Sequence, residues 1–329
     1  MVAIFGGRMA KWTKIWALGW MVLIVGLAAP VKVVAEPHVV ASIKPLHALV
    51  AGVMRGVGSP QLLLDDTQSP HYFALKPSQA RQLQKADIVF WIDPMLETPL
   101  AKLLGHMAPD AQHVAMMDQP GLVLHPNANA AAHANDRAST HNKDPEHDHE
   151  HDGHAKVNPH IWLDTSNAQK MVVLIRDRLA TSDPAHAGDY AANAETLLQR
   201  LSDLENTAAV KLAGVKALRF IMQHDAFIYT ERQFGLSAGL VVAVDHDTPP
   251  GTAHLQALRD LVASGSIACV FSEPLGTPSQ IDIIVGASSV RRATVDPVGI
   301  GLAAGPDLYF NMMTANFDAM ARCLAGGTG

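Results

Sequence analysis

Residues 183–212, DPAHAGDYAANAETLLQRLSDLENTAAVKL, form the stretch that decides the fold. Asp183 can cap a helix that has Pro184 in its first turn. An apolar stripe at helical spacing continues along the segment, and it consists of Leu197, Leu201, Leu204, Ala208 and Leu212. A helix of about 30 residues is about 45 Å long. Because a coiled coil needs several sustained heptads, we expect the stripe to pack against two lobes of this chain and to connect them stiffly.

Short apolar runs alternate with helical patterns on both sides of this segment. Before it, we expect strands at Val39–Ile43, Gln61–Leu64, Ile88–Trp91 and His113–Met117, and helices at Pro45–Met54 and Ser78–Lys85, with Ser78 as N-cap. After it, we expect strands at Arg219–Met222, Leu240–Val244, Ala268–Phe271 and Ala293–Val295, and helices at Phe227–Gln233, Thr252–Ala263 and Ser279–Val290. Such alternation predicts parallel sheets. The fold class is therefore α/β, with two similar lobes, each a mainly parallel sheet flanked by helices, joined by a long rigid helix.

The N-terminal region has the pattern of a secretory signal peptide. Three basic residues precede an apolar run at positions 15–30, and the small residues Val33 and Ala35 fit a cleavage site before Glu36. The apolar run has 16 residues, which is shorter than the roughly 20 that a membrane-spanning helix needs. An uncleaved membrane anchor is the alternative interpretation of this region.

The rest of the chain exceeds the size at which one hydrophobic core usually stops growing. We therefore expect a signal peptide at 1–35, an N-terminal lobe at 36–182, a linking helix at 183–215 and a C-terminal lobe at 216–329. Removal of residues 1–35 takes away four of the 25 basic residues and none of the 31 acidic ones, which leaves a net charge of −10 with neutral histidines. An acidic exported protein is a poor candidate for binding nucleic acid.

Seven of the 17 histidines lie between His125 and His154. The last four, His147, His149, His151 and His154, alternate with acidic residues. Imidazoles and carboxylates at this density are typical of metal capture. Because almost nothing here could pack a core, we expect a mobile loop at 125–157 and an accessory metal site in it. An engineered purification tag is the alternative, although tags lie at chain termini.

Three isolated histidines, each at the end of an expected element, give the sharper evidence for a metal site. His71 and His160 each follow a proline, which restricts the backbone, and His224 follows the strand at 219–222. Ligands in open α/β folds gather at the carboxyl ends of strands. Asp296 directly follows the strand at 293–295 and can supply a carboxylate. Three neutral imidazoles with a carboxylate or water suit tetrahedral Zn(II), whereas Mn(II) favours more oxygen ligands.

Three further residues are candidates for supporting roles. Glu273 also ends a strand and can orient a histidine from outside the ligand set, although a role in lobe contact or loop capping is equally open. Cys269 and Cys323 are the only cysteines. An exported protein meets oxidising conditions, so we expect a disulfide that holds the last helix. Two buried free thiols are the alternative, and no C-x-x-C spacing indicates redox catalysis.

Motifs spread over the whole mature chain resemble a known family through their order and spacing. They are Ala41-Ser42-Ile43-Lys44-Pro45, Ser69-Pro70-His71, Leu75-Lys76-Pro77-Ser78, Ala86-Asp87-Ile88-Val89-Phe90-Trp91, the acidic histidine segment, Pro159-His160-Ile161-Trp162-Leu163, His224-Asp225-Ala226-Phe227, Gln233-Phe234-Gly235-Leu236, Phe271-Ser272-Glu273-Pro274 and Asp296-Pro297. The chain resembles the ZnuA-type zinc-binding proteins of ABC importers, within the cluster of metal-specific solute-binding proteins.

The resemblance implies that His71, His160 and His224 bind zinc in the cleft between the lobes. Manganese members of the cluster have a carboxylate where this chain has His224, so the resemblance favours zinc. Some zinc members use a glutamate just before the first histidine, and Pro70 in that position here leaves Asp296 or a water as the fourth ligand. The cysteine pair resembles the disulfide of Gram-negative zinc members, which implies a periplasmic protein.

The function that the resemblance implies is capture and delivery of Zn(II) without chemical turnover. A monomer would dock on an integral-membrane ABC permease, and a separate subunit would hydrolyse ATP, because the chain contains no Walker sequence G-x-x-x-x-G-K-[ST]. A manganese or iron importer of the same fold is one alternative. A secreted zinc hydrolase is another, although the chain lacks an H-E-x-x-H motif. An adhesin or zinc buffer is the third.

Overall fold

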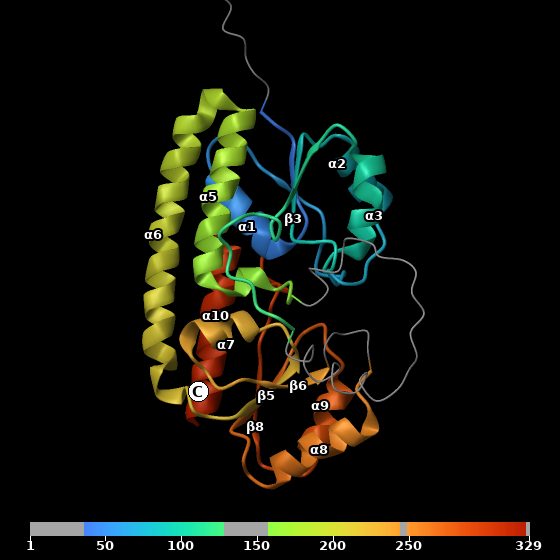
Figure 1. Ribbon diagram of the computed structural model, residues 1–329, viewed down its shortest axis with the longest axis vertical. Coiled ribbons are helices and arrows are strands. Elements are labelled where there is room, and N and C mark those ends of the chain that lie inside the picture. The colour runs from blue at the N-terminus through green and yellow to red at the C-terminus, as the bar shows by residue number, and fades with distance from the viewer. Residues whose placement is uncertain (1–35, 128–156, 244–248, 327–329) are drawn as a thin grey trace, which may run out of the picture. The chain divides into compact units, whose positions relative to one another are not determined.

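Four short strands in the first half of the chain form a parallel sheet in the order β2-β1-β3-β4, and Figure 1 labels β3 of this sheet. The computed structural model describes residues 36–127, 157–243 and 249–326. The elements of this N-terminal lobe are β1 (Val39–Ala41), α1 (Lys44–Val53), β2 (Gln61–Leu62), α2 (Pro77–Gln84), β3 (Ile88–Trp91), α3 (Thr98–Met107) and β4 (Gln112–Ala115). Val40 pairs with Gln61 on one side and with Val89 on the other. Strands β1 and β3 are buried throughout, because a parallel sheet is covered on both faces.

The second half of the chain repeats this arrangement. Its four parallel strands have the order β6-β5-β7-β8, so the second strand again lies at one edge and the first strand is central. The elements are β5 (Phe220–His224), α7 (Ile228–Phe234), β6 (Leu240–Ala243), α8 (Thr252–Ala263), β7 (Cys269–Ser272), α9 (Pro278–Val285) and β8 (Arg291–Thr294). Met222 pairs with Val241 and Phe271 in the strands beside it. The prediction of two similar α/β lobes is confirmed.

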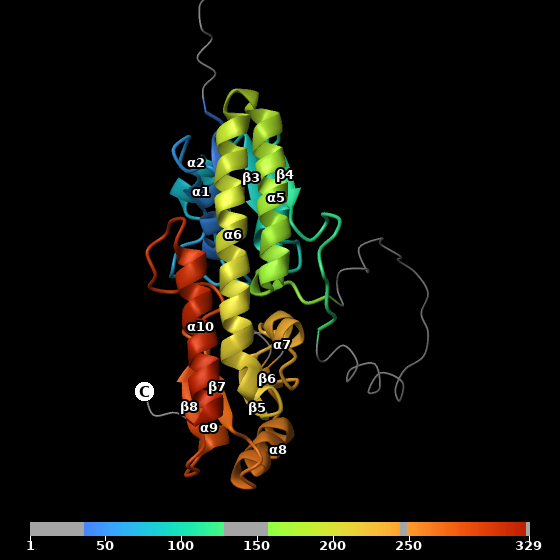
Figure 2. The same ribbon diagram turned by 90° about the vertical axis from the view of Figure 1, so that its left-hand side faces the viewer.

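Helix α6 (Ala187–Leu212) connects the two halves. It packs against α1, against α5 (Thr165–Ser182) and against α10 (Leu308–Ala325), and Figure 2 shows α5, α6 and α10 side by side. All five residues of the predicted apolar stripe are buried. Gly52 permits close packing of α1, because a Cβ there would lie 2.6 Å from a methyl carbon of Leu197. The predicted long connecting helix is confirmed.

One hydrophobic core extends through both lobes. It includes Leu46 and Phe90 from the first lobe, the α6 stripe, and Phe271 and Phe317 from the second. A smaller cluster lies between the second sheet and the helices α8 and α9. A disulfide joins Cys269 on β7 to Cys323 on α10, so the expected cystine is present. Residues 36–329 form one compact unit, and the shared core limits how freely the lobes can separate.

Several predicted boundaries are wrong. The long helix begins at Ala187 and has 26 residues, because Asp183 instead begins a 3-10 turn and its carboxylate accepts hydrogen bonds from His186 and Tyr190. Ser78 is not an N-cap: α2 already begins at Pro77, and proline is favoured as a first helical residue because its missing N–H is not needed there.

Other expectations lie outside the described residues. These are the signal peptide at 1–35 and the histidine-rich segment, apart from its ends at 125–127 and 157. The lobe limits at 182 and 215 stay predictions. Within the described part of the chain, no helix is long and apolar enough to cross a membrane.

Candidate metal centre

The three predicted histidines lie on three different kinds of local structure. His224 is the last residue of β5, whereas we expected it to follow the strand, and its backbone pairs with Ala243. His160 is the N-cap of the short 3-10 helix η2 (Ile161–Leu163). His71 lies between β2 and α2, and its N–H donates to the Ser69 hydroxyl at 3.3 Å. His224 and His160 are 2% and 4% exposed, whereas His71 is half-buried.

The fold brings these three side chains together. One ring nitrogen from each of them lies within 4.8 Å of the others, which makes this the only such group among the residues that the structure describes. The ring centroids of His160 and His224 are 5.0 Å apart, and those of His71 and His160 are 5.4 Å apart. The Nε2 atoms of His160 and His224 are separated by 3.2 Å. Two nitrogen ligands of a tetrahedral zinc ion at the usual bond length are about 3.3 Å apart.

Hydrogen bonds fix the tautomers of the two buried rings. Nδ1 of His224 lies 2.7 and 2.6 Å from the two carboxylate oxygens of Glu273, and Nδ1 of His160 lies 2.9 Å from Oδ1 of Asn158. Both partners are acceptors, so each neutral ring carries its proton on Nδ1 and presents a lone pair at Nε2. In these tautomers the two Nε2 atoms, 3.2 Å apart, are the ring atoms that can bind a metal ion. The arrangement therefore suits one cation bound by both nitrogens.

Glu273 is itself held in place. The residue is 6% exposed, and its backbone N–H donates to Oε1 of Gln223 at 2.7 Å. The Gln223 amide also donates to the carbonyl of Thr277. Gly276 leaves space for this amide, because a Cβ at that position would lie 2.1 Å from it. The predicted contact between Glu273 and a histidine is thus present, and its role in metal binding stays a prediction.

Asn158 is a site residue that sequence reasoning missed. Its Oδ1 accepts from both N–H and Nδ1 of His160, and its Nδ2 donates to the carbonyl of Asp225. The amide orientation is therefore determined by a donor on one side and an acceptor on the other. The residue is 1% exposed, and its carbonyl accepts from the Tyr229 hydroxyl at 2.6 Å. Its place two residues before His160, in Asn-Pro-His, was the available signal.

Asp296 lines the same pocket but does not belong to the histidine group. Its Oδ1 accepts the backbone N–H groups of Val298 and Gly299 at 3.0 and 2.8 Å. Burial raises the pKa of Asp296, and these backbone donors oppose that shift. The choice between Asp296 and a water as fourth ligand stays open. The pocket is lined by Ser69, Pro70, His71, His160, His224, Glu273, Pro274, Leu275, Asp296, Pro297 and Val298.

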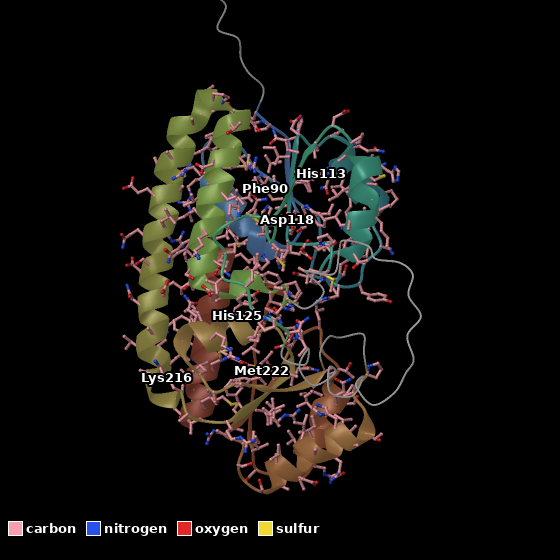
Figure 3. All side chains as sticks on the ribbon, in the orientation of Figure 1. Phe90, His113, Asp118, His125, Lys216 and Met222 are labelled. Carbon is pink, nitrogen blue, oxygen red and sulfur yellow. A yellow bond between two sulfur atoms is a disulfide. The ribbon has the colours of Figure 1, made fainter. Side chains whose placement is uncertain are left out.

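The accessory histidines lie outside the described residues, but the two ends of their segment do not. Pro126 and Val157 form an antiparallel bridge, and the N–H of Asn158 donates to the carbonyl of His125 at 2.8 Å. The His125 ring packs against Tyr229, with centroids 5.1 Å apart. Figure 3 labels His125, with Phe90 on β3 in the upper sheet and Met222 on β5 in the lower one. The histidine-rich segment therefore begins and ends beside Asn158, which holds His160.

Known proteins resemble this chain over nearly all of its described length. The family model "ZnuA: Zinc-uptake complex component A periplasmic" matches residues 39–323. The high-affinity zinc uptake system protein ZnuA of Brucella suis biovar 1 is 34% identical over 305 residues, covering 87% of this chain and 91% of that protein. The protein of the same name from Yersinia pestis is 31% identical, covering 95% of this chain and 98% of its own.

A solved structure described as "Crystal structure of ZnuA" superposes with a TM-score of 0.72 at 18% identity, covering 88% of this chain and all of that one. At this identity the likeness supports the fold alone. The family match and the two relatives cover most of the chain at a higher similarity. The chain therefore belongs to the ZnuA family of zinc-uptake solute-binding proteins.

Proposed function

We propose that this protein binds Zn(II) between its lobes through His71, His160 and His224 and delivers it to the permease of an ABC importer. The observation that carries the proposal is the approach of three imidazole nitrogens to within 4.8 Å of one another. Two relatives are named high-affinity zinc uptake system proteins, and this supports Zn(II) as the bound ion.

The donor set supports zinc over manganese. Three nitrogen donors converge, and two of them have fixed tautomers. Imidazole suits Zn(II), whereas Mn(II) prefers sites rich in carboxylate and water. Asp296 or a water completes the coordination. Zinc requires neutral imidazoles, so affinity falls as the pH drops below the ordinary histidine pKa of about 6.5.

Binding fits the site better than hydrolysis. A zinc hydrolase needs a general base beside an open coordination position. Glu273 is the carboxylate that could be considered as this general base, but it lies 2.6 Å from Nδ1 of His224. The other ring nitrogen, Nε2, is the one that approaches His160. A carboxylate in that place orients a ligand and raises its basicity. The protein acts as a carrier without chemical turnover.

The carrier works outside the cytoplasm, in the periplasm, after removal of residues 1–35. It acts as a monomer and docks on an integral-membrane permease, with a separate subunit supplying ATP hydrolysis. The accessory histidines His147, His149, His151 and His154 raise the local zinc concentration. They bind more weakly than the cleft, because ordering a segment of chain on binding costs entropy.

Competition titration of metal-free residues 36–329 tests this proposal. We expect wild type to prefer Zn(II) over Mn(II) by several orders of magnitude. His224→Asp should narrow that preference at least tenfold, because it replaces a nitrogen donor with oxygen. His113→Ala is the control, since His113, which is labelled in Figure 3, lies on β4 and its ring contacts the Ala108 carbonyl. Equal preference for the two metals in wild type would contradict the proposal. Zinc uptake by cells with and without the permease tests delivery.

A further inference from the structure

Lys44, the first residue of α1, is a buried lysine with three oxygen partners outside its own helix. The residue is 5% exposed. Its Nζ donates to the carbonyl oxygens of Gly299 and Leu302, each at 2.7 Å, and to the carboxylate of Asp66. An ammonium group has three N–H donors, and all three are satisfied here. A buried charge needs such partners, because burying it unpaired is very unfavourable.

The partners of Lys44 belong to two segments that line the metal pocket from different lobes. Asp66 lies in the His71 segment, residues 65–76, which connects β2 to α2. Gly299 and Leu302 lie in the 296–302 turn, which begins at Asp296. Asp66 also accepts the N–H of Gly301 at 3.2 Å. Lys44 and Asp66 thus join the His71 segment to the 296–302 turn, and we call this set of contacts the Lys44 latch.

The 296–302 turn is shaped to receive the ammonium group. Gly299 and Gly301 have φ angles of +78° and +76°, a region that favours glycine. A Cβ on Gly299 would also lie 3.1 Å from Leu308. The N–H of Leu302 donates to the Gly299 carbonyl at 3.2 Å, and Asp296 accepts the N–H groups at the start of the turn. The turn therefore directs two carbonyls at one point.

His71 is the ligand most able to leave the site. His224 lies in a sheet and His160 caps a 3-10 helix, and both are buried. His71 is half-buried on a segment between a strand and a helix. The shared core restrains the lobes themselves. If the His71 segment moves and takes His71 away from the other two ligands, the contacts of the Lys44 latch break.

We propose that Lys44 is a positioning residue that holds the His71 segment against the 296–302 turn and thereby sets the rate at which bound zinc leaves. This inference rests on the proposed function above. The proposal predicts a change in the rate of zinc release, because the latch delays the departure of His71. The three ligands themselves stay the same.

The chain provides a matched control for this proposal. Lys76 and Asp65 form a second lysine–aspartate pair, and both residues belong to the His71 segment. Their side chains are 48% and 49% exposed, against 6% for Lys44, and within the described ranges neither side chain bonds to a residue of the second lobe. Exposed pairs contribute little, whereas breaking a buried pair leaves an uncompensated charge.

The test is zinc release from residues 36–329 loaded with one equivalent of zinc and mixed with excess chelator. We expect Lys44→Met and Asp66→Asn each to speed release at least tenfold, with little change in the rate of zinc association. The double variant should be no faster than the faster single variant, because the two residues act together. Lys76→Met should stay within twofold of wild type. The visible spectrum of bound Co(II) should be unchanged in all variants, because the ligands are the same.

Each result decides one question. If wild type binds zinc tightly and both Lys44→Met and Asp66→Asn release it at the wild-type rate, the latch is wrong and the proposed function stands. If Lys76→Met speeds release equally, a role specific to the buried lysine is wrong. If Lys44→Met does not fold, Asp66→Asn decides alone, since that side chain is 43% exposed. If wild type itself fails to bind zinc, the proposed function fails and the latch fails with it.

Discussion

The two sides of the metal centre are built differently. On the C-terminal side, His224 lies in a strand, is 2% exposed and has a buried carboxylate on its Nδ1. On the N-terminal side, His71 lies in a half-buried connecting segment that is tied to the other lobe through Asp66 and Lys44. A rigid half and a movable half together allow a site to bind tightly and still release its ion. The difference indicates that affinity depends most on the rigid half and release on the movable half.

The largest expected effect separates these two histidines. We expect His224→Ala to lower zinc affinity by about 1,000-fold or more, which is about 4 kcal/mol, because it removes a preorganised ligand. His71→Ala should lower affinity only about 10- to 100-fold, since a water can replace a ligand at the half-buried position. Competition with a chromogenic chelator measures both. Equal losses, or a larger loss for His71→Ala, would contradict the division into rigid and movable halves.

A second prediction concerns the pH dependence of stability, and it involves one buried glutamate in each lobe. Burial raises the pKa of Glu97, which follows β3, and of Glu231 in α7 from 4.5 to about 7. Each folded-state carboxyl keeps a proton that the unfolded chain releases, so stability falls as the pH rises from about 4.5 to about 7. We expect Glu97→Gln and Glu231→Gln each to stabilise the metal-free protein at pH 8 by up to about 3 kcal/mol, with little effect at pH 4.5.

Urea unfolding at both pH values checks this second prediction. Because one core extends through both lobes, each variant should shift a single transition for the whole of residues 36–329. Two separate transitions, each sensitive to one of the glutamates, would show that the lobes unfold independently. Such a result would remove the argument that the shared core restrains the lobes, and it would weaken the contrast between a rigid and a movable half.

A smaller effect is expected from the residues that orient the two buried rings. Glu273→Ala and Asn158→Ala should each weaken zinc binding about 10- to 100-fold, the usual range for partners of metal-binding histidines. Asn193→Ala is the control, because the Asn193 side-chain amide also bonds to the backbone, donating to the carbonyls of Val53 and Arg55, and lies outside the metal pocket. Affinity titration with a melting curve for each variant separates a loss of binding from a loss of folding. Wild-type affinity in Asn158→Ala would show that His160 needs no orienting partner.

The architecture was predictable because local patterns determine it. The α6 stripe has the spacing of a helix and is buried as predicted, and β3 at Ile88–Trp91 has its predicted ends. Strand ends were less predictable, because His224 is polar and yet lies inside β5. Its burial is compensated by Glu273, which is 49 residues away and leaves no local signal. The N-terminus of α6 differs for a local reason, because the Asp183 carboxylate accepts hydrogen bonds from the nearby His186 and Tyr190 side chains and does not cap a helix that starts at Pro184.

The candidate site also has a part that the sequence predicted and a part that it did not. The sequence predicted which histidines would meet, because each one ends an element at the carboxyl edge of a sheet or follows a proline, and the structure brings all three together. It did not predict Asn158 or Lys44. Lys44 makes its contacts with Gly299 and Leu302 across long sequence separations, and periodicity and spacing carry no trace of them. Asn158 binds His160 two residues away, so Asn-Pro-His was a local signal, and only its contact with Asp225 is remote.

The most direct test of the account is a calorimetric zinc titration of metal-free residues 36–329 at neutral pH. Wild type is compared with a variant in which a short Gly-Ser linker replaces residues 128–156, and with the double variant His71→Ala/His224→Ala. The account predicts that the linker variant keeps one tight site and that the double variant loses it. If tight binding disappears with residues 128–156 and survives the double substitution, zinc is not held by the three histidines and the account is wrong.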